Sequence, residues 1–166
     1  MAKQRTSTGR KTRRKTARRS APNRAAVDVL IKRWFDELWN QSREDTIDRL
    51  LAPSARVFGL PTPDNRPLKG PEEFKPFYRQ FRAAFPDLRV TVERTVTQGD
   101  VAAVQCHVQG THRGDALGVP ATGKVVEFSG IVIVRAAGGK LVEGWNAFDF
   151  LTCFRQIGLV AEVVRS

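Results

Sequence analysis

The stretch Leu141–Phe150, which reads LVEGWNAFDF, has the features of a central strand in this 166-residue chain. Valine, tryptophan and phenylalanine favour strands, and successive side chains of a strand lie on opposite faces. The alternation predicts that Glu143, Trp145 and Asp149 share one face, where two carboxylates lie beside an indole. A carboxylate among aromatic rings is disfavoured in its charged form, which raises its pKa and suits it to general acid or base catalysis. We therefore expect Asp149 to be catalytic; the alternative is that it caps a following helix.

Hydrophobic periodicity predicts helices in the first half of the chain. The apolar residues of Val27–Leu38 recur with the i, i+3, i+4 spacing of one helix face. A short helix is predicted within Ser42–Pro53, opened by a capping box and stopped by the proline. Gly70-Pro71-Glu72-Glu73 predicts the start of a third helix, whose aromatic stripe ends at Phe85 and is expected to belong to the core. Pro76 should kink this helix or delay its start.

From Leu88 onward the hydrophobic period changes to two, which is typical of strands. Strands are predicted over residues 88–93, 101–112, 125–134 and 141–150, with turns at Gly99-Asp100 and Gly138-Gly139. His112 ends the apolar face of the second strand, so we expect its side chain to point inward. Helices followed by hairpin-linked strands predict an α+β domain, in which the helices pack on one face of a curved antiparallel sheet.

The positive charge of the chain is concentrated at its N-terminus. The net charge is +11, yet residues 1–24 hold ten basic side chains and no acid, which leaves 18 basic and 17 acidic residues elsewhere. This segment also lacks leucine, isoleucine, valine and aromatic residues, so we predict a disordered tail over 1–24 and a single domain over 25–166. Three interpretations of the tail stay open: non-specific contact with nucleic acid or another polyanion, a transit-like presequence, or an extension without a role.

Other features of the sequence narrow the class of protein. No apolar run is long enough to span a bilayer, so we expect no membrane span. Cys106 and Cys153 do not form a spaced disulfide framework, which favours free thiols and a reducing compartment such as the cytoplasm. We expect neither a metal nor a cofactor.

Several motifs, taken in order along the chain, resemble the SnoaL-like polyketide cyclase family, whose members are often called predicted ester cyclases. The motifs are Ala84–Leu88, Gly110–Gly114, Gly118–Lys124, Trp145–Asp149 and Gln156–Gly158, within about residues 25–160. The resemblance implies the cone-shaped nuclear-transport-factor-two-like fold, in which helices and a bent sheet enclose an apolar pocket for a small hydrophobic ligand. It also implies a homodimer formed through the outer face of the sheet.

The resemblance also implies a site. In that family the aspartate of the Trp-x-x-x-Asp motif is the general acid/base of a cofactor-free intramolecular aldol closure, and by motif match this is Asp149. His112, from the Gly-Thr-His motif, is the expected second catalytic residue and would orient the substrate. Trp145 and Asp149 should then lie on the concave face of the sheet. The expected substrate-binding residues are Trp145, Trp34, Phe58, Phe77, Phe81 and Glu143.

One position departs from the family pattern. After Leu51-Ala52-Pro53 many relatives carry an acid and then a histidine, and Phe58 stands about where that histidine would fall. An apolar residue there favours a second interpretation, because a fold does not fix a function. The alternative is a non-catalytic ligand-binding or dimerisation module whose basic tail contacts a polyanion.

Overall fold

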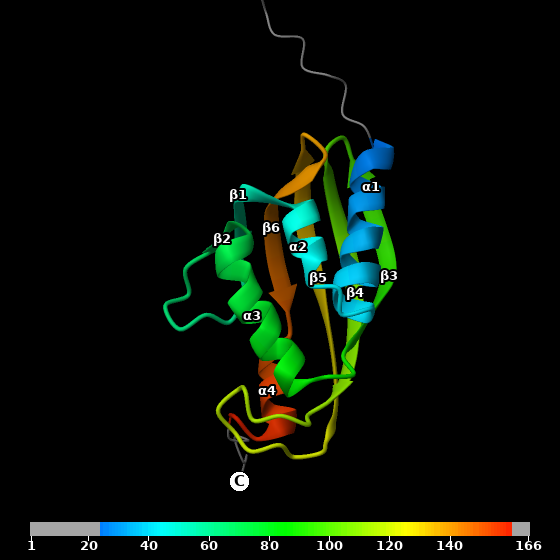
Figure 1. The fold of residues 1–166 in the computed structure, drawn as a ribbon. Helices are drawn as coiled ribbons and strands as arrows, with labels where there is room; N and C mark the ends of the chain where they lie inside the picture. Colours follow the sequence, from blue (N-terminus) through cyan, green and yellow to red (C-terminus); the bar gives the residue numbers. More distant parts are fainter. Residues whose placement is uncertain (1–23, 161–166) are drawn as a thin grey trace, which may run out of the picture.

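The computed structural model describes residues 24–160 and shows an α+β fold (Figure 1). The elements, in chain order, are α1 (Arg24–Arg33), η1 (Trp34–Asn40), α2 (Asp45–Leu50), β1 (Leu51–Phe58), β2 (Leu68–Lys69), α3 (Gly70–Ala84), β3 (Arg89–Gln98), β4 (Val101–Thr111), β5 (Val125–Ala137), β6 (Lys140–Phe148) and α4 (Phe150–Ile157). The predicted tail lies outside the described residues, apart from Arg24, with which α1 begins.

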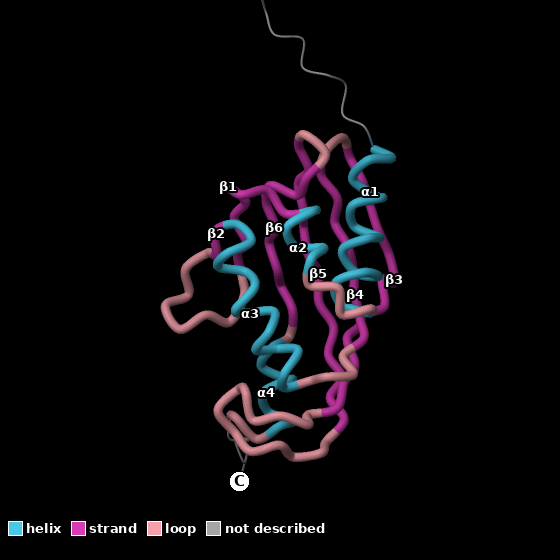
Figure 2. Tube along the Cα trace, viewed as in Figure 1, coloured by secondary structure: helices cyan, strands magenta, loops and turns pink. Residues whose placement is uncertain are grey.

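The six strands form one sheet in the order β2-β1-β6-β5-β4-β3. Neighbouring strands from β3 to β6 pair antiparallel, as predicted, and α1, α2 and α3 lie on one side of the sheet (Figure 2). The sheet also holds one parallel pair, because β1 pairs with β6 in parallel. β1 contains Pro53, which has no backbone N–H to donate. Pro53 lies where the pairing register shifts, between Leu51 and Arg56, so its missing donor is tolerated there.

The first predicted helix exists, but it changes its winding halfway. It buries Val27, Leu30, Ile31, Phe35 and Leu38, as its apolar face predicts. From Trp34 to Asn40, however, the backbone forms a π-helix, labelled η1, instead of continuing as an α-helix. The wider turn of a π-helix follows from hydrogen bonds between residues five apart instead of four.

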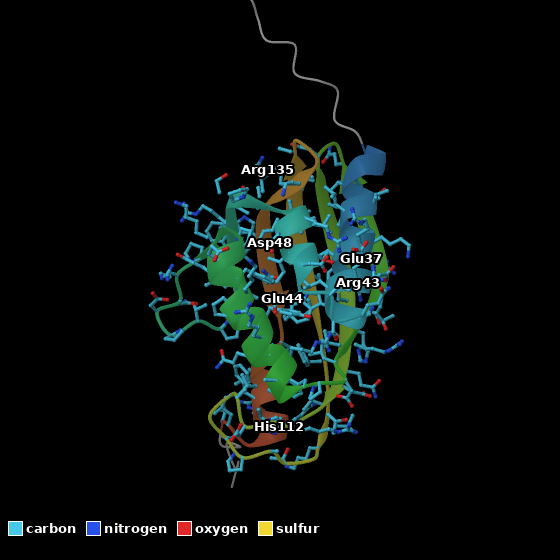
Figure 3. The ribbon with its side chains drawn as sticks, in the orientation of Figure 1. Glu37, Arg43, Glu44, Asp48, His112 and Arg135 are labelled. Atoms are coloured by element: carbon cyan, nitrogen blue, oxygen red, sulfur yellow. The ribbon has the colours of Figure 1, made fainter. Side chains whose placement is uncertain are left out.

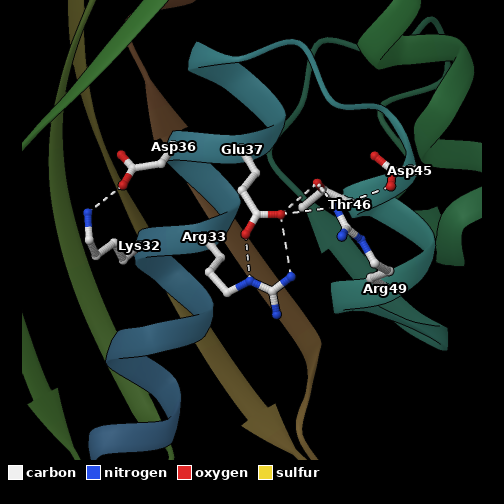
Figure 4. A network of polar contacts seen from close by, with 7 residues as sticks. All are labelled: Lys32, Arg33, Asp36, Glu37, Asp45, Thr46 and Arg49. Carbon is white, nitrogen blue, oxygen red and sulfur yellow. Dashed lines mark hydrogen bonds and ion pairs between the residues drawn. The ribbon is translucent and has the colours of Figure 1, made fainter.

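The start of α2 differs from the prediction. The residue before the helix is Glu44, and it makes no side-chain capping bond, so the predicted capping box does not form. A separate ionic network holds α2 against η1 instead (Figure 4). Glu37 accepts hydrogen bonds from Arg33 at 2.6 Å, Arg49 at 3.0 Å and the buried Thr46 hydroxyl at 3.2 Å. The bond from Arg33 contributes most to holding the pKa of Glu37 below its usual value.

The third helix, α3, begins at Gly70 as predicted. Pro76 lies within it, so the proline does not delay its start. Phe74, Phe77 and Phe81 are buried along one side of α3 and face the sheet. None of the described helices is long and apolar enough to cross a membrane.

Candidate ligand-binding cavity

An apolar cavity of about 90 Å³ lies between the helices and the inner face of the sheet. Its wall is rich in aromatic rings, because η1 and α3 place aromatic residues on one side and strands β5 and β6 supply the other. The aromatic lining residues are Trp34, Phe35, Trp39, Phe74, Phe77, Phe81, Phe128, Phe148 and Phe150. Trp34, Phe77 and Phe81 were among the residues expected to bind substrate, and the structure brings these three together.

Strand β6 presents the opposite face to the cavity from the one predicted. Gly144, Asn146 and Phe148 line the cavity, whereas Trp145 lies on the outer face and is 51% exposed. The reason is a shift in the pairing of β5 with β6. Ala136 pairs with Leu141, whereas Arg135, the residue just before it in β5, pairs with Glu143. One extra residue in a strand reverses the faces of all the residues beyond it. Leu141 therefore stays buried while Trp145 turns outward.

Phe58 and Trp145 lie against each other on this outer face. Their rings stack with centroids 3.9 Å apart and an interplanar angle of 6°, and the Arg56 guanidinium lies 5.2 Å from the Phe58 centroid. Neither residue lines the cavity. The expectation that Trp145 lies on the concave face was therefore wrong, and Phe58 does not occupy a cavity-lining position.

Glu143 borders the cavity, but its carboxylate is occupied elsewhere. It accepts hydrogen bonds from the Trp145 indole at 2.6 Å and from Arg135 at 3.1 Å. The indole bond contributes most to holding the pKa of Glu143 below its usual value. Its carboxylate is therefore ionised and paired, and it helps to order the outer face.

Asp149 caps helix α4, which was the alternative that the sequence left open. Its Oδ1 accepts the backbone N–H of Thr152 at 2.9 Å, and its Oδ2 accepts the Thr152 hydroxyl at 2.7 Å. These two bonds, the hydroxyl first, hold the pKa of Asp149 below its usual value. The expected rise in this pKa was wrong, because the carboxylate is exposed and hydrogen-bonded instead of enclosed by aromatic rings. Nevertheless, its two neighbours Phe148 and Phe150 both line the cavity.

His112 points inward as predicted and is fully buried near the end of the molecule that carries α4 (Figure 3). Its ring lies 5.5 Å from that of Phe85. Its Nδ1 accepts the backbone N–H of Thr122 at 3.3 Å and lies 3.1 Å from the Thr122 hydroxyl. Its Nε2 is buried and finds no partner among the described residues. Neither His112 nor Asp149 is among the residues that line the cavity, so the structure does not bring the expected pair together there.

Trp39 and Asn146 are among the cavity residues that were not predicted to bind substrate. Asn146 donates a hydrogen bond to the Phe58 carbonyl at 2.8 Å, which ties β6 to the end of β1. Its position inside the Trp-x-x-x-Asp motif was the available signal. The cavity thus offers aromatic contact and few polar groups, an arrangement that suits a small apolar ligand. In the described part of the chain, no group of three or more His, Cys, Asp or Glu residues is placed to hold a metal ion.

A comparison with protein families shows which family the chain belongs to. The model of the family described as SnoaL-like polyketide cyclase matches residues 29–157. The chain belongs to this family. The matched residues include η1, α3, His112 and Asp149. The cavity described above therefore lies within the domain that the family model covers. None of the curated proteins compared with the chain matches it.

Solved structures agree with this assignment. A candidate SnoaL-like polyketide cyclase from Jannaschia sp. CCS1 matches with a TM-score of 0.75 and 24% identity, over 87% of this chain and 100% of its own. IdmH, a candidate polyketide cyclase from Streptomyces antibioticus, matches with a TM-score of 0.68 and 29% identity, over 80% of this chain and 98% of its own. AclR, a candidate hydroxylase from Streptomyces galilaeus, matches with a TM-score of 0.73 and 22% identity, over 84% of this chain and 100% of its own. At such low identity the first and third likenesses show the shared fold alone.

Proposed function

We propose that this SnoaL-like protein binds a small hydrophobic substrate in the aromatic cavity and catalyses cofactor-free acid/base chemistry on it. The proposed reaction class is intramolecular ring closure of a polyketide-type ester, with Asp149 as the proton-transferring residue. The observation that carries the proposal is the position of Asp149 between Phe148 and Phe150, two residues of the cavity wall. Membership of the cyclase family supports the reaction class.

The bonds from Thr152 lower the pKa of Asp149, which favours its ionised form. An ionised carboxylate accepts a proton, so Asp149 would remove one from the carbon next to a substrate carbonyl. The resulting enolate would attack a second carbonyl of the same molecule, and the proton on Asp149 would return to the new alkoxide. No redox partner is needed. The cavity would contribute by holding the two reacting carbons close together.

Thr152 donates one hydrogen bond to each carboxylate oxygen of Asp149, and each oxygen keeps a second lone pair that can accept a substrate proton. His112 would contribute indirectly, because it holds the loop after β4 through Thr122 and does not line the cavity. We therefore assign catalysis to Asp149 and positioning to His112.

The test begins with a thermal-shift screen of cyclic and ester-containing apolar compounds, followed by turnover assays of those that stabilise the protein. Asp149→Asn should lower turnover by roughly a hundredfold or more while leaving ligand binding nearly unchanged. Asp115→Asn is the matched control, because Asp115 is exposed in the loop after β4 and does not border the cavity. Full turnover in Asp149→Asn would refute the assignment.

A second candidate function is a ligand-binding protein without catalysis. It is favoured by the two bonds from Thr152 that engage both oxygens of Asp149 in capping α4. This function predicts that the wild type and Asp149→Asn bind the same compounds equally well and convert none above background. The same screen therefore separates the two functions.

We propose further that the protein is a homodimer that pairs through the outer face of its sheet. Trp145, Ile131 and Ile133 are about half exposed there, and Ile133 pairs directly with Trp145 across strands β5 and β6. Exposed apolar side chains grouped on one face favour contact with another protein surface. Ile133→Lys should convert the dimer to a monomer in analytical ultracentrifugation. Val29→Lys, at an exposed valine of α1, should leave the dimer intact. A monomeric wild type would contradict the proposal.

For the basic N-terminal segment, outside the described residues, we propose non-specific contact with a polyanion. Nine basic residues without an acid in 1–23 favour binding through counterion release, which weakens steeply as salt rises. Deleting residues 1–23 should remove most retention on heparin, and retention that survives the deletion would assign it to the folded domain. We expect these functions in a reducing compartment such as the cytoplasm, because Cys106 and Cys153 are free thiols.

A further inference from the structure

The π-helix η1 brings two tryptophans to the same wall of the cavity. Trp34 and Trp39 are five residues apart and both line the cavity. In an α-helix, residues five apart point about 140° away from each other. In a π-helix, whose hydrogen bonds join residues five apart, they are neighbours on one side. The change of winding at Trp34 is therefore what allows both indoles to reach the cavity.

The spacing of the two indoles matches that of two rings on the facing helix. Trp34 lies 5.2 Å from Phe74, and Trp39 lies 5.3 Å from Tyr78 in an edge-to-face arrangement, both distances joining ring centroids. Phe74 and Tyr78 are four residues apart on α3, the spacing of neighbours on an α-helix. Two rings five residues apart in η1 thus contact two rings four residues apart in α3. We call these two ring pairs the aromatic seam.

One end of the seam is fixed by hydrogen bonds. The Tyr78 hydroxyl donates to the Leu38 carbonyl at 3.1 Å, and Arg82 donates to the Trp39 carbonyl. The Asn40 side chain bonds both the N–H and the carbonyl of Val90, at 2.8 and 2.9 Å, and so holds the end of η1 to β3. These bonds hold the backbone of η1 and the Tyr78 ring in place. The indole side chains of Trp34 and Trp39, both partly exposed, are left as the movable parts of the seam.

The size of the cavity makes such movement necessary. A volume of about 90 Å³ is smaller than the roughly 150 Å³ of a cavity that holds benzene. A ring-bearing ligand therefore enters only if lining side chains shift, and Phe74, Phe77 and Phe81 are too deeply buried to yield first. A flat unsaturated ring needs the smallest opening, and its π-face can stack on an indole.

We propose that Trp34 and Trp39 determine which ligands this cavity accepts, by selecting flat unsaturated rings over saturated rings of the same size. The inference rests on the proposed binding of a small hydrophobic ligand in the cavity, and it assigns the selectivity to the seam. It does not depend on catalysis by Asp149.

The test compares two probes of equal carbon skeleton, 2-naphthol and its fully saturated counterpart decahydro-2-naphthol, by isothermal titration calorimetry. The wild type should bind 2-naphthol at least about tenfold more tightly, within the range that aromatic contacts provide. Trp34→Leu and Trp39→Leu should each bring the ratio of the two affinities close to one. Trp145→Leu, the same change at a partly exposed tryptophan outside the cavity, should keep the wild-type ratio. Circular dichroism establishes that each variant is folded.

The outcomes separate this inference from the proposed function. Equal affinity of the wild type for both probes, or a preference that survives both seam substitutions, would overturn the role of the seam while leaving catalysis by Asp149 intact. Failure of the wild type to bind either probe would overturn both the seam and the cavity as a site for ring-bearing ligands. Normal selectivity together with no loss of turnover in Asp149→Asn would overturn only the catalytic assignment.

Discussion

Thr152 engages both carboxylate oxygens of Asp149, one through its backbone N–H at 2.9 Å and the other through its hydroxyl at 2.7 Å. The first bond satisfies an N–H group in the first turn of α4, and the second fixes the rotamer of the carboxylate. The same residue therefore starts the helix and, in the proposed reaction, transfers the proton. The two bonds leave a second lone pair on each oxygen, so the cap orients the carboxylate that the proposed reaction uses.

Thr152→Val should raise the pKa of Asp149 toward its ordinary value. The substitution removes the hydroxyl bond, the largest cause of the lowered pKa, and keeps the backbone bond. Carbon-13 NMR of the labelled carboxylate, followed as a function of pH, measures the change directly. Thr152→Ser retains the hydroxyl and should keep the wild-type titration. Identical titrations in Val and Ser variants would show that the hydroxyl does not control this carboxylate.

The free energy of unfolding should fall in acid, partly through Asp149 and Asp87. Asp87 accepts the backbone N–H and the hydroxyl of Thr111, both at 2.7 Å, and the backbone bond is the main cause of its lowered pKa. A carboxyl whose pKa is lower in the folded state stabilises the fold above its unfolded-state pKa and loses that effect as pH falls through the folded value. Urea unfolding from pH 7 to pH 2 measures this loss. Asp87→Asn should show a shallower loss than the wild type; an unchanged slope would contradict this role.

Tyr78→Phe should reduce the free energy of unfolding by about 1 kcal/mol, because it removes the buried hydrogen bond to the Leu38 carbonyl. The ring and its contact with Trp39 are retained, so the change isolates the hydroxyl. Chemical denaturation monitored by fluorescence provides the measurement. An equally stable Phe variant would mean that water replaces the hydroxyl at Leu38 and that η1 is not fastened to α3 in this way.

Gly130→Ala should destabilise the fold by about 1 to 3 kcal/mol through overpacking. A Cβ atom at this position would lie 2.4 Å from the Phe148 ring and 2.5 Å from the Phe148 Cα, on the strand paired with it. The absence of a side chain at Gly130 is thus what lets Phe148 take its place in the cavity wall. Thermal unfolding gives the comparison.

The matched control is Gly144→Ala on the neighbouring strand. Its added Cβ would meet only Val57, at 4.0 Å, which is an ordinary contact distance. This variant should be destabilised less than Gly130→Ala, because its added Cβ meets no atom at less than an ordinary contact distance. Equal destabilisation by both alanines would show that loss of glycine itself, and not the contact with Phe148, is responsible.

The sequence by itself determined the class of fold and most of its elements. The apolar face of Val27–Leu38, the start of α3 at Gly70 and the alternation in β5 were all predicted correctly, because helix and strand periods are local properties of the chain. The order of the family motifs also sufficed for the family assignment. An inward His112 followed from the same alternation, along an uninterrupted strand paired without a bulge to β5.

Only the tertiary structure decided which face of β6 meets the cavity and what Asp149 does. The face of Trp145 depends on one extra residue in the pairing with β5, and the parallel contact of β1 with β6 joins segments far apart in the chain. The pKa of Asp149 depends on which donors reach its carboxylate, and motif spacing does not reveal that Thr152 occupies it. The π-helical turn that turns Trp39 toward the cavity likewise forms against α3 and β3. Register and local winding depend on partners distant in sequence, and the pKa of Asp149 depends on the side-chain conformation that reaches Thr152, so the local pattern left all three open.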